Sequence, residues 1–274
     1  MRILRSMLSR RWIAATLLAA AGAAVCFRLG IWQLDRLEQR RLFNARVEAQ
    51  INEPQLELAG EALRVDLYNM EYRQVRAAGE YDFSSQIALR NQYWGNEWGA
   101  HLVTPLILEG SDEVVLVDRG WIPAANFESG DWAKFDEPGR VEVLGIIRRP
   151  QSKAELGSRS DQVPAAGAEA LKAWYFINIS AISQQVPYPL LPVYIQQAPQ
   201  ADRDSLPYRS QPELELSEGP HMGYALQWFS FAGLLILGYP YFIRRQGNKR
   251  IPVERSEGKA SATGGPHSRT TRPA

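Results

Sequence analysis

Two long apolar segments, one near each end of the chain, constrain the fold more than any other feature. The first, "WIAATLLAAAGAAVCF" (Trp12 to Phe27), carries no charge, and its apolar character resumes after Arg28. The second, "YALQWFSFAGLLILGYPYFI" (Tyr224 to Ile243), has aromatic residues at both ends, where amphipathic rings favour the membrane interface. Each is close to the length of about 20 residues with which a helix crosses a bilayer. The sequence therefore predicts transmembrane helices at 12–32 and 224–243.

Basic residues on the outer flanks of these segments predict the topology. They are Arg2, Arg5, Arg10, Arg11, Arg244, Arg245, Lys249 and Arg250. By the positive-inside rule, both termini are then cytoplasmic. The expected organisation is a cytoplasmic N-terminus (1–11), an extracytoplasmic domain (33–223) and a polar, disordered cytoplasmic tail (244–274).

An alternative for the first segment is a cleaved secretory signal, which shares a basic start and an apolar core. Val25 directly before Cys26 disfavours a lipoprotein signal, which needs a small residue there. Small residues recur along the segment and allow close approach of a second helix, which favours a retained span. They are Ala15, Ala19, Gly22 and Ala23.

Composition excludes several classes of function. A formal net charge of +1 argues against a nucleic-acid surface, so no nucleic acid is expected as a partner. The single cysteine, Cys26, excludes a disulfide framework or a CxxC pair within one chain. With three histidines, and without GxSxG, HExxH, P-loop or dinucleotide signatures, the chain is not expected to be an enzyme.

The central part reads as a helix followed by a β-rich domain. Strong helix formers from Gln33 to Gln50 continue the first span as a helix that Pro54 ends. Short β-rich runs follow, and no helical crossover pattern alternates with them. The runs are 72–82, 86–94, 101–108, 113–123, 140–150, 174–180 and 190–197. We expect a loop at 151–167, a short helix at 179–186, and overall a membrane α+β protein whose domain is a mainly antiparallel sheet or small barrel.

Two groups within the strands are weighed as candidate sites. Asp118 and Arg119 in "VDRGWIP" could act as an acid and a base of an enzyme, but neighbours on a strand point to opposite faces. The favoured interpretation is that Arg119 orders a turn or pairs with a carboxylate, Gly120 gives the bend and Trp121 packs. His101 starts the strand "HLVTPLIL" and is expected to be structural, with a ligand role as a secondary candidate.

His221 stands apart because it lies at the start of the second span. On a helix it shares one face with Tyr224 and Trp228 at three- and four-residue spacing. Ala225, Ala232 and Leu235 complete that face. An imidazole nitrogen beside aromatic rings would suit a metal-centred, largely apolar macrocycle, with His221 as the iron ligand. The alternative is that His221 hydrogen-bonds a loop while the two rings belong to an interfacial aromatic belt.

Several stretches together resemble the surfeit locus protein 1 family. These are "LGIWQLDRLEQR" (29–40), "YRQVRAAGEYD" (72–82), "HLVTPL" (101–106), "VLVDRGWIP" (115–123) and "HMGYALQWFSFA" (221–232), in the family's order and between two spans. The resemblance covers residues 29–243. One departure is Asp118, where the family frequently has Asn before Arg-Gly-Trp.

The resemblance implies a membrane assembly factor for the haem–copper terminal oxidase, cytochrome c oxidase. It implies binding of haem a at the His221 position during insertion into the catalytic subunit, with haem a synthase as a further partner. In a bacterial cell the central domain would be periplasmic and the membrane the inner one. Arg73, Arg76 or Arg119 would pair with the propionates by charge complementarity. The alternative function is a scaffold that stabilises an assembly intermediate without haem.

Overall fold

The computed structural model describes residues 2–151, 161, 169–199, 205–211 and 214–248. It divides into two compact units by their internal contacts. A helical unit comprises residues 1–37 and 219–274, and a barrel unit comprises residues 38–218. Helix α2 contributes to both, because it runs without interruption across residue 37.

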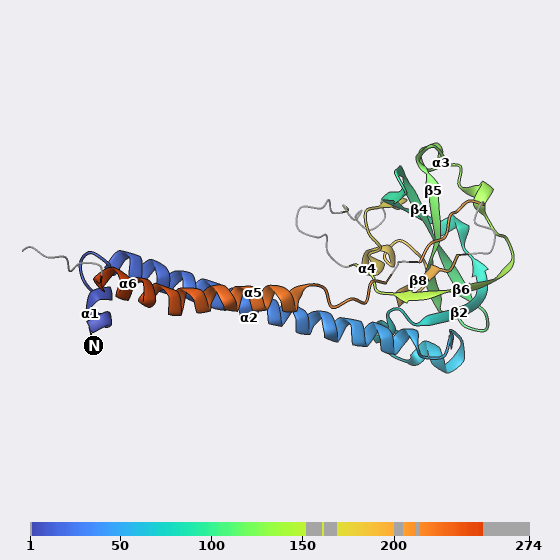
Figure 1. Ribbon diagram of the computed structural model, residues 1–274. Helices are drawn as coiled ribbons and strands as arrows, with labels where there is room; N and C mark the ends of the chain where they lie inside the picture. The colour runs from blue at the N-terminus through green and yellow to red at the C-terminus, as the bar shows by residue number, and fades with distance from the viewer. Residues whose placement is uncertain (1, 152–160, 162–168, 200–204, 212–213, 249–274) are drawn as a thin grey trace, which may run out of the picture. The chain divides into compact units, whose positions relative to one another are not determined.

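The helical unit contains two helices that are long and apolar enough to cross a membrane (Figure 1). A short helix α1 (Arg2–Met7) precedes α2 (Ile13–Ile51). The second span consists of α5 (His221–Gly233), a π-helical turn η5 (Leu234–Gly238) and α6 (Tyr239–Asn248). The prediction of two candidate spans on either side of a β-rich domain is confirmed. The π-helical turn was not predicted.

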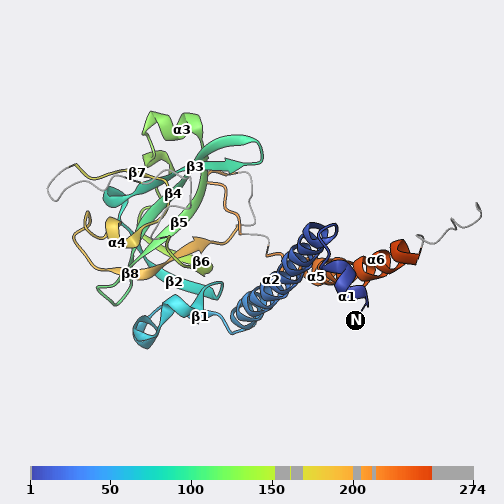
Figure 2. The same cartoon turned by 90° about the vertical axis from the view of Figure 1, so that its left-hand side faces the viewer.

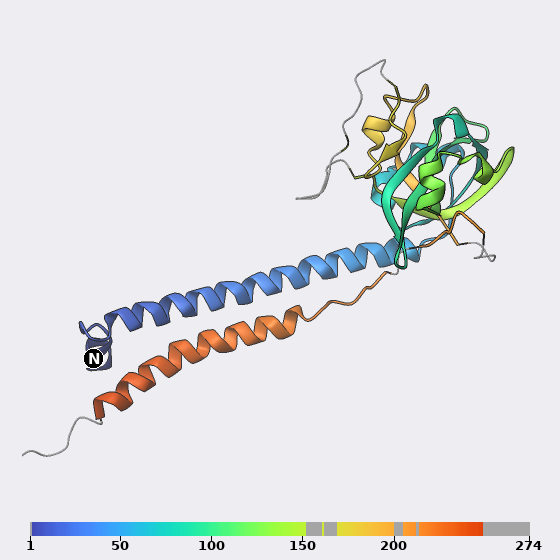
Figure 3. The same cartoon turned by 90° about the horizontal axis from the view of Figure 1, so that it is seen from above.

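Small residues hold α2 and the second span side by side (Figure 3). Ala23 on α2 and Ala225 and Ala232 on α5 are buried. A Cβ added at Gly30 would lie 2.5 Å from the Phe229 ring, so glycine is needed for this close approach. The packing agrees with the predicted small-residue face of the first span, and Gly30 extends that face by two turns.

The helix predicted to continue from Gln33 to Gln50 is present, and its part from residue 38 onward belongs to the barrel unit. Asn44 is buried and its side-chain amide donates to the Leu216 carbonyl at 2.6 Å. Arg41 makes a two-pronged ion pair with Glu218 at 2.7 and 2.8 Å. These bonds fix the chain that leads into α5 along the last turns of α2, which ends at Ile51, three residues before Pro54.

One eight-stranded sheet forms the barrel unit. Its strands are β1 (Leu56–Glu57), β2 (Gln74–Tyr81), β3 (Ile87–Trp94), β4 (Glu97–Leu108), β5 (Val114–Pro123), β6 (Arg140–Arg148), β7 (Ala173–Trp174) and β8 (Leu190–Gln197). Their order is β1-β2-β6-β8-β5-β4-β3-β7, and an additional β2–β4 pairing closes the sheet on itself. Five pairings are antiparallel and three, β1–β2, β3–β7 and β5–β8, are parallel. The mainly antiparallel barrel is as predicted.

Short helices close the ends of the barrel. They are η1 (Gly60–Arg64), η2 (Leu67–Met70), η3 (Phe83–Ser85), α3 (Ala124–Ser129), η4 (Ala133–Phe135) and α4 (Ile179–Ile182). Figure 2 shows α3 at one end of the barrel and β1 at the other. The principal core combines inward residues of five strands with one residue after β1 and the first residue of η2: Leu58, Leu67, Val75, Ala77, Tyr81, Leu106, Leu108, Val115, Val117, Val143, Ile147, Leu191, Val193 and Ile195.

The strand predicted at 174–180 is wrong, because only Ala173 and Trp174 pair with β3. Beyond them the Tyr175 amide donates to the Asp161 carboxylate at 3.0 Å instead of a neighbouring strand. Asn178 then caps α4, its side chain accepting from the Ala181 amide. The short helix predicted at 179–186 is present but ends at Ile182. The loop predicted at 151–167 lies outside the described residues except for Gln151 and Asp161.

Candidate functional site

His221 is the first residue of α5 and lies within the helical unit. Its side chain is half-buried, and Nδ1 lies 2.9 Å from Oε1 of Gln33 on α2. Because a carbonyl oxygen only accepts, Nδ1 carries the proton and donates it. In the neutral form of the ring, the lone pair is then on Nε2, to which no described residue donates a hydrogen bond. A histidine held in this way presents one oriented nitrogen to a ligand.

A glycine leaves room beside that nitrogen. Gly219 has a φ of +69°, a left-handed conformation that side chains rarely adopt. A Cβ added at Gly219 would lie 3.6 Å from Nε2 and 3.5 Å from Cδ2 of His221. The absence of a side chain at Gly219 therefore leaves unfilled a position that lies 3.6 Å from Nε2.

Tyr224 and Trp228 lie one and two turns along α5 from His221, as the helical spacing predicts. Tyr224 is 48% exposed, whereas Trp228 is half-buried and packs edge-on against Phe231, with ring centroids 5.9 Å apart. Ala225 is the buried residue between them. The helix face predicted from the sequence is therefore only partly accessible, because Ala225 and Ala232 are buried whereas Tyr224 is exposed. A role for these rings in binding stays a prediction.

Gln33 is the site residue that sequence reasoning missed. It belongs to the "LGIWQ" stretch, but its partner is 188 positions away in the chain. A signal was present, because Ala23, Cys26, Gly30 and Gln33 recur at three- and four-residue spacing on α2. A polar residue on the packed face of an apolar helix needs a hydrogen-bond partner, which would have pointed to the second span.

His101 on β4 pairs with Asp118 on β5. Its Nδ1 lies 2.9 Å from both carboxylate oxygens, and the two side chains are 13% and 8% exposed. Burial lowers the pKa of His101, but the negative charge of Asp118 and the hydrogen bond that this carboxylate accepts raise the pKa by more, so it lies above the ordinary 6.5. The same carboxylate accepts from the Gly120 amide at 3.1 Å. The structural role expected for His101 fits this arrangement.

Arg119 occupies a β-bulge and points away from Asp118. Leu102 pairs with Gly120 and Val103 with Asp118, so Arg119 is the extra residue. Asp118 contacts His101 and Arg119 contacts Glu137, which agrees with the prediction that the two side chains point to opposite faces of the strand. Gly120 has a φ of +118° and Trp121 is fully buried, as the structural interpretation of "VDRGWIP" requires.

The guanidinium of Arg119 is completely buried in the barrel. It donates to Gln86 at 3.0 Å, to Glu137 at 2.9 Å and to the Phe135 carbonyl. The rings of Tyr81 and Phe83 lie 4.9 and 5.2 Å from it. With no accessible surface, Arg119 cannot meet a propionate, and that expectation is wrong. The expected pairing with a carboxylate is present.

Arg209 brings a second positive charge to the same carboxylate. Its guanidinium donates to Glu137 at 2.9 Å and to the Arg119 carbonyl at 3.3 Å. Burial lowers the pKa of Arg209, and the Glu137 charge opposes that shift. Two guanidiniums on one acid fasten the 205–211 segment to β5, next to the paired Trp121 and Tyr208 backbones. This constellation is structural.

Two span-capable helices on either side of a mostly antiparallel barrel, with a histidine presented at the start of the second span, define a membrane protein with a β-barrel domain. The profile of the SURF1 family matches residues 20–233. This range covers the later part of the first span, the whole barrel unit and the first part of the second span. The chain belongs to the SURF1 family.

Individual relatives agree with this assignment. The chain is 28% identical to "SURF1-like protein" of Rickettsia conorii over 227 residues, covering 81% of this chain and 88% of the relative. It is 25% identical to "Surfeit locus protein 1" of Mus musculus over 237 residues, with coverages of 81% and 74%. For "SURF1-like protein" of Caenorhabditis briggsae the identity is 22%, with coverages of 85% and 77%. The family is generally known for cytochrome oxidase assembly factors.

Proposed function

We propose that this protein is an assembly factor of the haem–copper terminal oxidase that holds haem a on His221 before insertion into the catalytic subunit. Membership of the SURF1 family supports the role in oxidase assembly. The observation that carries the haem-binding part is the hydrogen bond from His221 Nδ1 to Gln33, which leaves Nε2 with an available lone pair. Neutral imidazole nitrogen is the protein ligand that haem iron most often takes.

Each residue of the site would contribute differently to holding haem a. His221 supplies the axial nitrogen, and Gln33 fixes the orientation of its ring. Gly219 keeps the approach to the nitrogen open. The exposed face of Tyr224 and the half-buried Trp228 offer apolar, aromatic surface to the edge of the macrocycle.

The partner of the histidine suits a site that must release its cargo. A carboxylate hydrogen-bonded to a ligating histidine increases its basicity and strengthens the metal bond. Gln33 is a neutral amide, so it orients the ring without adding charge. His101, by contrast, has the Asp118 carboxylate as its partner. We assign binding to the histidine with the weaker electron-donating partner.

The surroundings proposed for this activity follow from the flanking charges. Both termini face the bacterial cytoplasm, and the barrel unit is periplasmic at the inner membrane. The catalytic subunit of cytochrome c oxidase is the recipient of haem a, and haem a synthase is the donor. Both are membrane proteins, so a carrier site at the start of a membrane span lies at the depth where transfer takes place.

A haem-independent scaffold is the second candidate, and one observation favours it. On the β3–β4 hairpin, Tyr93 is 65% exposed and Trp94 is 37% exposed. Exposed aromatic residues of this size are typical of protein interfaces. A scaffold would use such a surface to grip the catalytic subunit. It would co-purify with that subunit even when haem a synthesis is blocked, whereas a carrier would lose the complex.

The proposal is tested in cells whose only copy carries His221→Ala. We expect haem a in membranes, measured by pyridine haemochrome, to fall at least fivefold while the level of the variant protein stays normal. His267→Ala is the matched control, because it removes a histidine from the tail, and should retain the wild-type haem a content. Full haem a and oxidase activity in the His221→Ala cells would contradict the proposal.

A further inference from the structure

In its described part, the helical unit carries arginines without acidic partners at the end opposite His221. No Asp or Glu occurs between Met1 and Gln33 or between Gly219 and Val253. Arg5 and Arg11 are exposed and form no ion pair with any described residue. An anion that neutralises these guanidiniums must therefore come from outside the described part of the chain.

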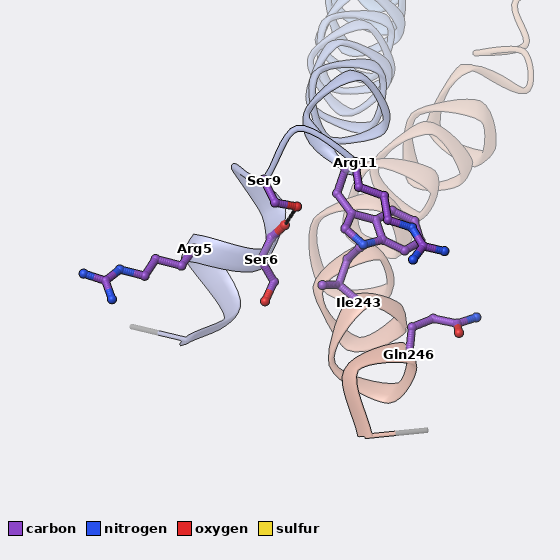
Figure 4. Close-up of a pocket in the computed structure, with 7 residues that line it drawn as sticks. Arg5, Ser6, Ser9, Arg11, Ile243 and Gln246 are labelled. Atoms are coloured by element: carbon purple, nitrogen blue, oxygen red, sulfur yellow. Dashed lines mark hydrogen bonds between the residues drawn. The ribbon is translucent and has the colours of Figure 1, made fainter. Parts of the chain in front are cut away.

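A pocket lies between these two arginines, where α1 meets the end of the second span (Figure 4). Its volume is about 390 Å³. It is lined by Arg5, Ser6, Ser9, Arg11, Trp12, Ile243 and Gln246. In Figure 4, Arg5 extends outward from the α1 side of the pocket, Arg11 lies on the other side, and the buried Ile243 lies between the two residues. Polar groups thus surround an apolar floor.

Specific contacts give this pocket its shape. The Thr16 hydroxyl lies 2.8 Å from the Tyr239 hydroxyl, which joins the first turns of α2 to α6. The Trp12 ring packs edge-on against Phe242 with centroids 6.0 Å apart, and the Arg11 guanidinium lies 5.5 Å from the Trp12 centroid. Ser9 Oγ donates to the Ser6 carbonyl at 2.7 Å and fixes the turn between α1 and α2.

We propose that this pocket binds the phosphate of an anionic phospholipid headgroup. A guanidinium recognises phosphate through paired N–H donors, and two of them on the two sides of the pocket suit a phosphodiester. Trp12 and Ile243 provide apolar surface for the glycerol and the first methylenes of the acyl chains. The pocket lies at the basic ends of both candidate spans, which is the depth at which lipid phosphates are found.

A lipid phosphate is favoured over a free phosphate by the apolar floor. Inorganic phosphate would gain nothing from Trp12 and Ile243 and would lose its hydration. The glycerol of a phospholipid would contact Trp12 and Ile243, while its acyl chains stay in the bilayer. Among anionic lipids, one that carries two phosphates would engage Arg5 and Arg11 together and should bind most tightly.

The test uses the full-length protein purified in detergent and titrated with lipids under native mass spectrometry. The probes are cardiolipin, phosphatidylglycerol and phosphatidylcholine, with inorganic phosphate as a separate competitor. The test variant is Arg5→Gln/Arg11→Gln. The matched control is Arg244→Gln/Arg245→Gln, which removes the same charge from exposed residues of α6 that do not line the pocket.

We expect wild-type protein to prefer the anionic lipids over phosphatidylcholine. The test variant should lose affinity for them by about 30-fold, because each of its substitutions removes a charge-assisted hydrogen bond to the phosphate, which contributes about fivefold or more. The control variant should lose threefold or less. The proposal is overturned if both variants weaken equally, if neither weakens, or if inorganic phosphate at the lipid's concentration displaces the lipid. Haem content is not measured, so the result is independent of the His221 proposal.

Discussion

At the residue scale, two histidines in this chain differ in the group that each one's Nδ1 faces. Gln33 presents a neutral carbonyl oxygen to the His221 ring, whereas Asp118 presents a carboxylate that stabilises the charged form of His101. The difference separates a ring that can offer a lone pair to a metal from one committed to an internal ion pair. The sequence predicted His221 and its helical face, but not either histidine's partner, because both partners come from other elements.

His101 gives a prediction about pH. The pKa of this imidazole is above 6.5 in the folded protein, so the stabilisation by Asp118 is complete below pH 6.5 and disappears as the pH rises through the folded pKa. In Asp118→Asn the ring remains buried without its counter-charge. We therefore expect the His101 titration midpoint, followed by NMR of the Cε1 proton in the full chain, to fall below the wild-type value.

The control for this titration is Asp112→Asn, at an exposed position of the β4–β5 turn. It removes an acid of the same kind without touching the imidazole, and the His101 midpoint should not move. A wild-type midpoint at or below 6.5 would show that burial outweighs the attraction of Asp118.

At the element scale, the bulge in β5 determines where the polar groups of the barrel point. The extra residue, Arg119, turns its guanidinium onto Tyr81 and Phe83, while Asp118 stays on the other face with His101. Gly120 permits this because its φ is +118° and because a Cβ would lie 2.6 Å from the Tyr208 carbonyl oxygen. That carbonyl accepts the Trp121 amide at 2.8 Å.

Gly120→Ala should therefore be strongly destabilising. Backbone strain and the collision with Tyr208 together are expected to reduce the free energy of unfolding by about 3 kcal/mol. The measurement is urea unfolding of the full chain in detergent, followed by tryptophan fluorescence. Gly139→Ala is the matched control, because Gly139 also has a positive φ but nothing lies within 4 Å of an added Cβ. It should cost about 1 kcal/mol from strain alone. Equal losses would exclude the collision.

Sequence reasoning located most strands of the barrel because each is a short apolar run between turn residues. It placed the bend at Gly120 for the same local reason. It failed at 174–180, where "WYFINIS" has strong strand propensity but Asp161 accepts the Tyr175 amide and Asn178 caps the helix that follows. It also could not predict that Arg209 and Arg119 share Glu137, because these three residues come from distant segments that only the fold brings together.

At the scale of the whole molecule, the two units contribute different structural features. The helical unit supplies the span-capable helices with His221 and the basic pocket, and the barrel unit supplies a closed sheet with exposed aromatic residues on one hairpin. The apolar segments and flanking charges were sufficient to predict two spans. The π-helical turn Leu234–Gly238 left no comparable signal, because its residues are as helix-compatible as their neighbours.

Topology is tested with single cysteines in a chain whose native Cys26 is replaced by alanine. Tyr93→Cys lies on the exposed hairpin, and Arg245→Cys lies on exposed α6 beyond the apolar segment. The positive-inside rule predicts that a membrane-impermeant maleimide labels position 93 in intact spheroplasts and labels position 245 only after lysis. The reverse pattern, or labelling of both before lysis, would contradict the proposed orientation.

The most direct test of the haem proposal is the absorption spectrum of the detergent-purified protein. Wild-type protein made in cells that synthesise haem a should show a Soret band and contain haem a in stoichiometric ratio to the protein. The same protein made in cells without haem a should show no Soret band. His221→Ala should lose the band while His267→Ala retains it. A wild-type protein without pigment under haem a supply, or a His221→Ala protein with an unchanged spectrum, would contradict the account.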